Sequence, residues 1–175
     1  MNVRLAAELA VAIALAAVLD LISKSLPIPR LPYGGSVSLR ALPILVITLR
    51  HGLKAGVTAG AAYGMVDFLI HPVFVHPVQL ILDYPVGLGV LGCAALCWQV
   101  GAAVSTARLV LGVTLACGLR LLAHFLSGVV FFGEYAPAGQ PVWLYSLVYN
   151  ASYLLPETIL LILLLRLMLR RMANH

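Results

Sequence analysis

Long runs of hydrophobic residues dominate this chain, and most of its charged residues fall at the ends of these runs. A membrane-spanning helix needs about 20 predominantly apolar residues. The pattern therefore predicts an all-α integral membrane protein, with residues 1–175 forming one domain and six transmembrane helices in one bundle. The predicted spans are about residues 5–22, 39–49, 55–70, 78–98, 109–132 and 142–169.

The connection between the first two predicted spans, about residues 23–38, stands out by its length and composition. It carries three prolines and two glycines within LPIPRLPYGG, which favour a loop over a helix. Long loops between packed elements are often functional lids. We therefore expect this segment to cover a site at one membrane face.

Lysine and arginine residues indicate how the predicted bundle is oriented. With six spans, one membrane face has only Lys24 and Arg30. The other face has Arg4, Arg50, Lys54, Arg108, Arg166, Arg170 and Arg171. Because cytoplasmic loops carry the excess of basic residues, both termini should be cytoplasmic.

Composition also indicates which class of protein this is. The chain is 62% hydrophobic and 10% charged, with a mean hydropathy of +1.04. The net charge of +5 does not indicate a nucleic-acid partner, because the basic residues are scattered at span ends. The first apolar run, from Leu5, is interpreted as a retained span, since no signal-peptidase-like site precedes a soluble domain. Cys93 and Cys97 have no nearby His or carboxylate in sequence, so small packing residues are favoured over a zinc site.

Polar and aromatic side chains gather at one predicted membrane depth. His124, Gly128 and Phe132 are spaced by four residues, so they share one helix face. Tyr145 and Asn150 fall in the first turns of the last span. Polar residues within spans are costly and usually face a cavity or a partner. These residues therefore predict half of a ligand pocket in the outer half of the membrane.

Asp83, about one turn into the fourth span, adds a carboxylate to this pocket. A carboxylate, the Asn150 amide and the rings of Tyr84, Phe132 and Tyr145 suit a flat, positively charged heteroaromatic ligand. Alternatives remain for each residue taken alone. Asp83 is also a helix N-terminal acid, His124 is also compatible with a hydrogen-bonded core, and tyrosines also form interfacial belts.

The interpretation of the Ala10 and Ala14 pair and of two acids within the spans is open at this point. Ala10 and Ala14 form a small-xxx-small pair, which serves either packing within the chain or docking to another membrane subunit. Asp20 and Glu157 are acids within spans, and pairing of Glu157 with Arg120 is one hypothesis.

No sequence motif for ATP hydrolysis or for a hydrolase is present: neither G-x-x-x-x-G-K-[ST] nor G-x-S-x-G nor H-E-x-x-H occurs. We expect no enzyme activity, no metal and no cofactor. A binding protein without an energy source either binds passively, facilitates diffusion or depends on partners.

Four stretches carry a family resemblance: NVRLAAELAVA, GGSVSLRALPILVITLRHGLKAG, HPVQLILDYPVG and AHFLSGVVFFGEYAPAGQPVWLYSLVYNASY. With them the chain resembles the thiamine-specific substrate-binding subunits (S components, the ThiT/YuaJ family) of energy-coupling factor (ECF) transporters. The resemblance implies six helices and a deep thiamine site under a lid. It places Asp83 at a pyrimidine-binding carboxylate and His124 and Phe132 at ring contacts. Further ligand contacts fall at Tyr84, Tyr145 and Asn150.

The resemblance also implies partners. Ala10 and Ala14 match a docking motif for a transmembrane coupling subunit (T component), which works with two ATPases that alone use ATP. The whole S component would topple in the prokaryotic cytoplasmic membrane, surrounded by lipid. This chain departs from some members at Gly34 and Ser38, where they have Trp and Glu, so its lid contacts differ.

Two other functions stay open. One is an S component for another vitamin or a thiamine precursor such as hydroxymethylpyrimidine. The other is a small intramembrane enzyme acting on a lipid or peptide. Such an enzyme needs a nucleophile beside His124, and only Ser127, on a neighbouring helix face, lies near in sequence.

Overall fold

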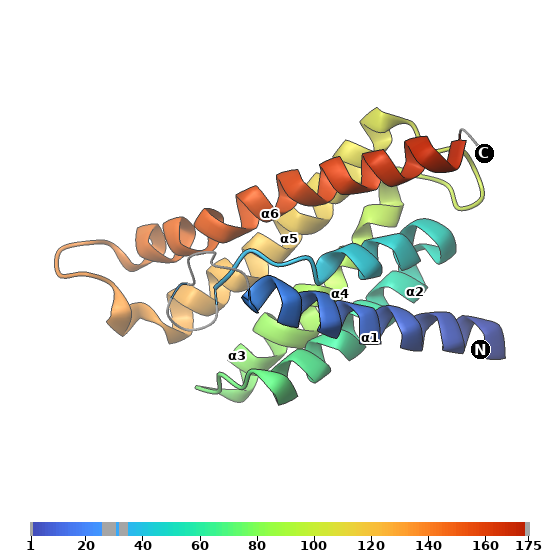
Figure 1. Cartoon of the computed structure of the whole chain (residues 1–175). Coiled ribbons are helices and arrows are strands. Elements are labelled where there is room, and N and C mark those ends of the chain that lie inside the picture. Colours follow the sequence, from blue (N-terminus) through green and yellow to red (C-terminus); the bar gives the residue numbers. More distant parts are fainter. Residues whose placement is uncertain (1, 26–30, 32–34, 174–175) are drawn as a thin grey trace.

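The computed structural model describes residues 2–25, 31 and 35–173, and every regular element in these residues is helical. The longer helices are α1 (Val3–Ser25), α2 (Ala41–Ile70), α5 (Thr106–Phe131) and α6 (Val142–Ala173). The shorter elements are α3 (Pro77–Ile81), η2 (Leu82–Val86), α4 (Gly87–Gly89), η3 (Val90–Cys97) and η4 (Gly133–Tyr135). Figure 1 shows an elongated bundle with both ends of the chain at the same end of the molecule.

Within the described residues, five helical stretches are long and apolar enough to cross a membrane, rather than the six predicted. The difference lies in α2, which contains both predicted spans 39–49 and 55–70. Its helix is interrupted at Gly52, where φ is 81° and ψ is −168°. This left-handed conformation favours glycine. A Cβ on Gly56 would overlap the Thr48 hydroxyl, so the two arms of α2 lie against each other, as Figure 1 also shows.

The second arm of α2 packs closely on the segment from α3 to η3. Gly56, Gly60 and Gly64 are spaced by four residues and share one helix face. A Cβ on Gly60 would overlap the Leu88 carbonyl, and one on Gly64 would overlap the Tyr84 carbonyl. Contact between backbones therefore fixes the position of the segment that carries Asp83 and Tyr84.

The predicted span 78–98 is not one regular helix, and its first irregularity lies at Pro85. Proline has no N–H to donate within a helix. The Gly87 N–H donates to the Leu82 carbonyl, five residues back, and the chain forms the π-helical turn η2. π-turns within helices are frequent at functional sites. Asp83 and Tyr84 both lie in this turn.

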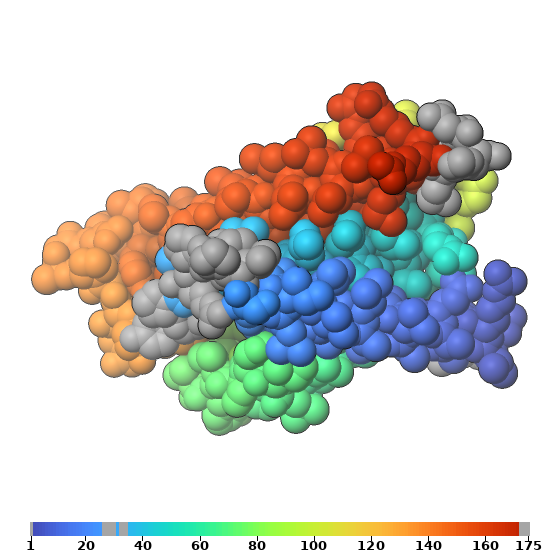
Figure 2. Space-filling model, viewed as in Figure 1, coloured from blue at the N-terminus to red at the C-terminus, as the bar shows by residue number. Residues whose placement is uncertain are grey.

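Helix α5 packs between η3 and α6. Its first turn is capped by Ser105, whose Oγ accepts a hydrogen bond from the Arg108 N–H. Val113, Ala116, Leu161 and Leu165 belong to the buried core. Helix α1 lies on the surface along much of the molecule (Figure 2). Many large apolar side chains are exposed on the outer helices, as expected for a surface in contact with lipid.

Candidate functional site

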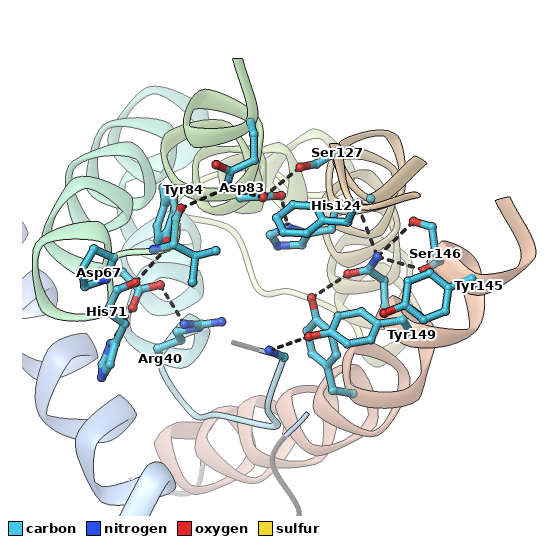
Figure 3. A pocket seen from close by; sticks show the side chains of 18 of the residues that line it. Arg40, Asp67, His71, Asp83, Tyr84, His124, Ser127, Tyr145, Ser146 and Tyr149 are labelled. Atoms are coloured by element: carbon cyan, nitrogen blue, oxygen red, sulfur yellow. Dashed lines mark hydrogen bonds and ion pairs between the residues drawn. The ribbon is translucent and has the colours of Figure 1, made fainter. Parts of the chain in front are cut away.

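A cavity of about 270 Å³, seen from close by in Figure 3, lies at the end of the bundle remote from the two termini, which Figure 1 marks. The ends of α2 and α5, the start of α6 and the segment α3–η2 surround it. Its walls contain every residue that the sequence predicted for the ligand site: Asp83, Tyr84, His124, Gly128, Phe132, Tyr145 and Asn150. Residues from four distant parts of the sequence thus meet around one hollow of small-molecule size.

Asp83 is the centre of the hydrogen bonding on one wall. Its Oδ1 lies 3.0 Å from the Nδ1 of His124. Its Oδ2 accepts hydrogen bonds from Ser127 Oγ at 2.9 Å and Gln79 Nε2 at 2.8 Å. These three contacts fix the orientation of the carboxylate. A carboxylate has about four acceptor positions, so this arrangement leaves capacity for a ligand.

Asn150 connects the two helices of the opposite wall. Its Nδ2 donates to the Ser146 carbonyl at 2.9 Å and to the His124 carbonyl at 3.3 Å. Its Oδ1 accepts from the Tyr153 hydroxyl at 2.9 Å. Asn150 therefore holds α6 against α5 at the level of His124, and it lines the cavity.

Gly128 allows the same close approach of α5 and α6. A Cβ at this position would overlap Ser146 Oγ, which itself donates to the Phe125 carbonyl at 2.9 Å. The glycine lines the cavity, but its missing side chain matters mainly for helix packing.

The aromatic residues supply ring surfaces. The Tyr84 hydroxyl donates to the His71 carbonyl and accepts from the Val73 N–H, both at 2.9 Å. Tyr84 thus ties the loop after α2 to η2, and its ring lines the cavity. The rings of Tyr145 and Tyr149 lie 6.0 Å apart, and Tyr149 also contacts Tyr153.

Sequence reasoning missed two of the three residues that orient Asp83, namely Gln79 and Ser127. Gln79 lies four residues before Asp83, and this helical spacing was a usable signal. The Gln79 side chain also accepts from the Val75 N–H and donates to the Val73 carbonyl, so it links the loop to the site. Ser127 was considered only as a partner of His124, whereas it donates to Asp83.

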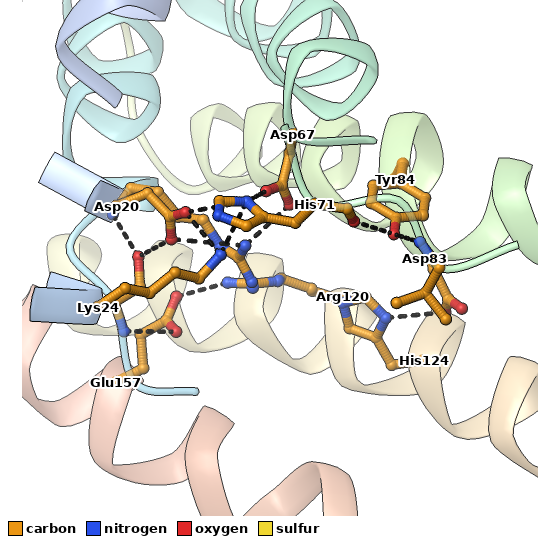
Figure 4. Close-up of polar contacts among 12 residues, drawn as sticks. Asp20, Lys24, Asp67, His71, Asp83, Tyr84, Arg120, His124 and Glu157 are labelled. Atoms are coloured by element: carbon orange, nitrogen blue, oxygen red, sulfur yellow. Dashed lines mark hydrogen bonds and ion pairs between the residues drawn. The ribbon is translucent and has the colours of Figure 1, made fainter. Parts of the chain in front are cut away.

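A cluster of charged residues forms another part of the cavity wall, and sequence reasoning did not place it there (Figure 4). Lys24, Arg40, Asp67 and His71 line the cavity, and Asp20 lies behind them. Arg40 pairs with Asp67 at 2.8 Å and lies 3.6 Å from Asp20. Lys24 Nζ lies 2.8 Å from Asp20 and 2.9 Å from His71 Nδ1. Two carboxylates thus balance two cations where α1 meets both ends of α2.

Asp20, Asp67 and His71 offer ligand atoms within 4.8 Å of one another, a spacing that also suits a metal ion. The ammonium group of Lys24 already lies between Asp20 and His71. Side-chain cations therefore account for the charge of these carboxylates.

The hypothesis that Glu157 pairs with Arg120 is confirmed. The two side chains are buried and form a short ion pair between α5 and α6. Glu157 also accepts from the Ser38 N–H at 3.4 Å, and Ser38 Oγ donates to Asp20 at 2.9 Å. Ser38 thus joins the two buried acids that the sequence left unassigned.

The predicted lid, about residues 23–38, is described only in part. Tyr33 and Gly34 lie outside the described residues. Gly35 lines the cavity, and its N–H donates to the Tyr149 hydroxyl at 3.1 Å. Ser38 is buried in the charged network rather than in the cavity wall.

Ala10 and Ala14 are exposed on α1, whereas Leu9, Ala12 and Ala16 are buried. Val11, Leu15 and Val18 share the exposed side of this helix. The interpretation of Ala10 and Ala14 as packing within the chain is therefore wrong, and their face is open to a partner or to lipid.

An apolar helical bundle with a polar and aromatic cavity at one end is the architecture of a membrane-embedded protein that binds a small molecule. The family model for thiamine transporter protein (Thia_YuaJ) matches residues 6–175. The chain is 43% identical over 162 residues to a thiamine transporter ThiT of Bacillus subtilis, covering 87% of this chain and 83% of that protein. It is 32% identical over 133 residues to a ThiT of Lacticaseibacillus paracasei, covering 69% and 66%.

The fold matches a solved structure of ThiT from Listeria monocytogenes with a TM-score of 0.81. This match has 23% sequence identity and covers 99% of this chain and 98% of that one. The chain belongs to the thiamine transporter protein (Thia_YuaJ) family. It is a multi-pass cell-membrane protein for transport and not an enzyme.

Proposed function

We propose that this chain is the thiamine-binding S component of an ECF transporter for thiamine uptake. Family membership and the names of its relatives support the ligand. The single observation that carries the proposal is the Asp83 carboxylate, which three donors orient in the wall of a cavity that Phe132 and Tyr145 also line.

Thiamine has an aminopyrimidine ring, a positively charged thiazolium ring and a hydroxyethyl group. In the proposed complex, Asp83 accepts hydrogen bonds from the pyrimidine edge, with His124 beside it. The rings of Phe132 and Tyr145 lie against the ligand rings, and an aromatic face attracts the thiazolium charge. The Asn150 amide and Tyr84 complete the contacts.

The transport cycle requires partners in this proposal. The chain carries no ATP-binding motif and needs no cofactor of its own. A T component docks at Ala10 and Ala14, and two ATPases supply the energy with which the whole subunit topples and carries its site inward. The two arms of α2 cross the membrane separately, which gives six crossings and cytoplasmic termini, in agreement with the distribution of lysine and arginine.

Calorimetric titration of the purified full-length chain tests the ligand. Neither Trp98 nor Trp143 lines the cavity, so heat is a better signal than tryptophan fluorescence. Thiamine, its hydroxymethylpyrimidine half and riboflavin are compared. We expect tight binding of thiamine, weaker binding of the pyrimidine half and no binding of riboflavin. Binding of the pyrimidine half with exclusion of thiamine would instead assign the site to a thiamine precursor.

A further inference from the structure

A second hollow, of about 180 Å³, lies between the start of α5 and the end of α6. This is the end of α5 that is remote from the thiamine cavity. Its lining residues are Val104, Thr106, Leu109, Arg166, Leu169 and Arg170. The proposed function uses none of them.

The charge in this hollow has no counter-charge in the described residues. None of the six acidic residues of the chain lies between positions 84 and 133 or after position 157. Arg166 and Arg170 take part in none of the ion pairs found among the described residues. Arg166 Nε is buried and has no hydrogen-bond partner there. Arg166 as a whole is half-buried and Arg170 is exposed, so the cost of an unpaired buried group applies to the Nε of Arg166.

Apart from Thr106, the other residues that line the hollow are apolar. Leu109 is buried, and Leu169 is partly buried. Beyond them, Leu111 and Leu167 are 62% and 52% exposed on the outer surface of the same two helices. A ligand that fits has an anionic group for the arginines and a hydrocarbon part that continues along this surface.

We propose that this hollow binds the phosphate of an anionic phospholipid at the membrane face that carries both chain termini. Arg166 and Arg170 donate to the phosphate oxygens, for which the guanidinium geometry is well suited. The positive end of the α5 dipole adds a favourable contribution. The acyl chain lies along Leu109 and Leu169. Basic pockets between membrane helices bind anionic headgroups in this manner.

Native mass spectrometry of the full chain tests the proposal, with dioleoylphosphatidylglycerol and dioleoylphosphatidylcholine added in detergent. The variants are Arg166→Gln and Arg170→Gln. Arg171→Gln is the matched control, because Arg171 is an exposed neighbour that does not line the hollow. We expect preferential retention of the phosphatidylglycerol, reduced about fivefold by each cavity substitution and unchanged by Arg171→Gln.

Three results would overturn the proposal. Equal retention of the two lipids would remove the role of the anionic headgroup. An equal loss in Arg171→Gln would replace the site by diffuse surface charge. Displacement of the lipid by millimolar inorganic phosphate would assign the hollow to a free anion. Unchanged thermal unfolding of each variant in lipid-free detergent excludes misfolding as the cause of a loss.

Discussion

Asp83 is the residue on which the proposed recognition of thiamine depends most directly. Asp83→Asn removes the negative charge and replaces one acceptor oxygen by a donor that faces Ser127, Gln79 or His124. We expect thiamine affinity to fall at least tenfold, about 1.4 kcal/mol, in calorimetric titration. Glu134→Gln is the matched control, because Glu134 is exposed in η4 and does not line the cavity. Equal affinity of Asp83→Asn and Glu134→Gln would exclude Asp83 from the site.

Asn150 leads to a different expectation, because its amide is also structural. Asn150→Ala leaves the Tyr153 hydroxyl and the His124 carbonyl without this partner, and a buried unsatisfied group costs about 1–3 kcal/mol. We expect both weaker thiamine binding, by about tenfold or more, and a lower unfolding temperature without ligand. Differential scanning fluorimetry measures the second effect. A variant with unchanged unfolding would contradict the structural role of Asn150.

The sequence predicted the residues of the cavity better than the bonds among them. Helical spacing placed His124, Gly128 and Phe132 on one face, and their convergence with Asp83 followed from span topology. The bond from Ser127 to Asp83 and the pairing of Arg40 with Asp67 depend on how the helices are rotated relative to each other. The spacing of residues along one helix gives no information on this rotation. Only the family resemblance assigned the ligand.

The contact between α5 and α6 gives an element-scale prediction with an internal control. Gly128→Ala places a methyl group on Ser146 Oγ, so the hydroxyl must rotate and lose its bond to the Phe125 carbonyl, or the helices must separate. We expect lower thermal stability by about 1 kcal/mol or more and weaker thiamine binding. Gly118→Ala, on the same helix, adds a methyl group with no atom within 4 Å. It should leave both properties unchanged or raise stability, since alanine favours helix.

The helices themselves were largely predictable, because long apolar runs have few alternatives in a membrane. Gly52 interrupts α2 between the two runs that the sequence analysis had separated. A local departure at Pro85 shows where such prediction ends. Pro85 converts part of the fourth span into a π-turn, and hydropathy alone does not reveal this. Asp83 and Tyr84 lie in this turn, so its geometry influences where their side chains point.

At the scale of the whole molecule, the exposed face of α1 and the cavity are connected through charged residues. Asp20 and Lys24 belong to the last turns of α1, and they contact Arg40 and His71 in the cavity wall. Ala10 and Ala14 lie on the exposed side of the same helix. The surface proposed for the coupling subunit is therefore separate from the ligand site, although one helix contributes to both.

This separation allows binding and transport to be tested independently. Ala10→Trp and Ala14→Trp add a large side chain to an exposed helix face, where close approach of another helix requires small residues. We expect thiamine affinity of the isolated chain to remain unchanged and uptake by cells that express the complete transporter to fall to background. Ala62→Trp is the control, because Ala62 is exposed on α2 and should tolerate the change in both assays. Loss of thiamine binding in the α1 variants would show that this helix face supports the cavity, and normal uptake would place the coupling subunit elsewhere on the molecule.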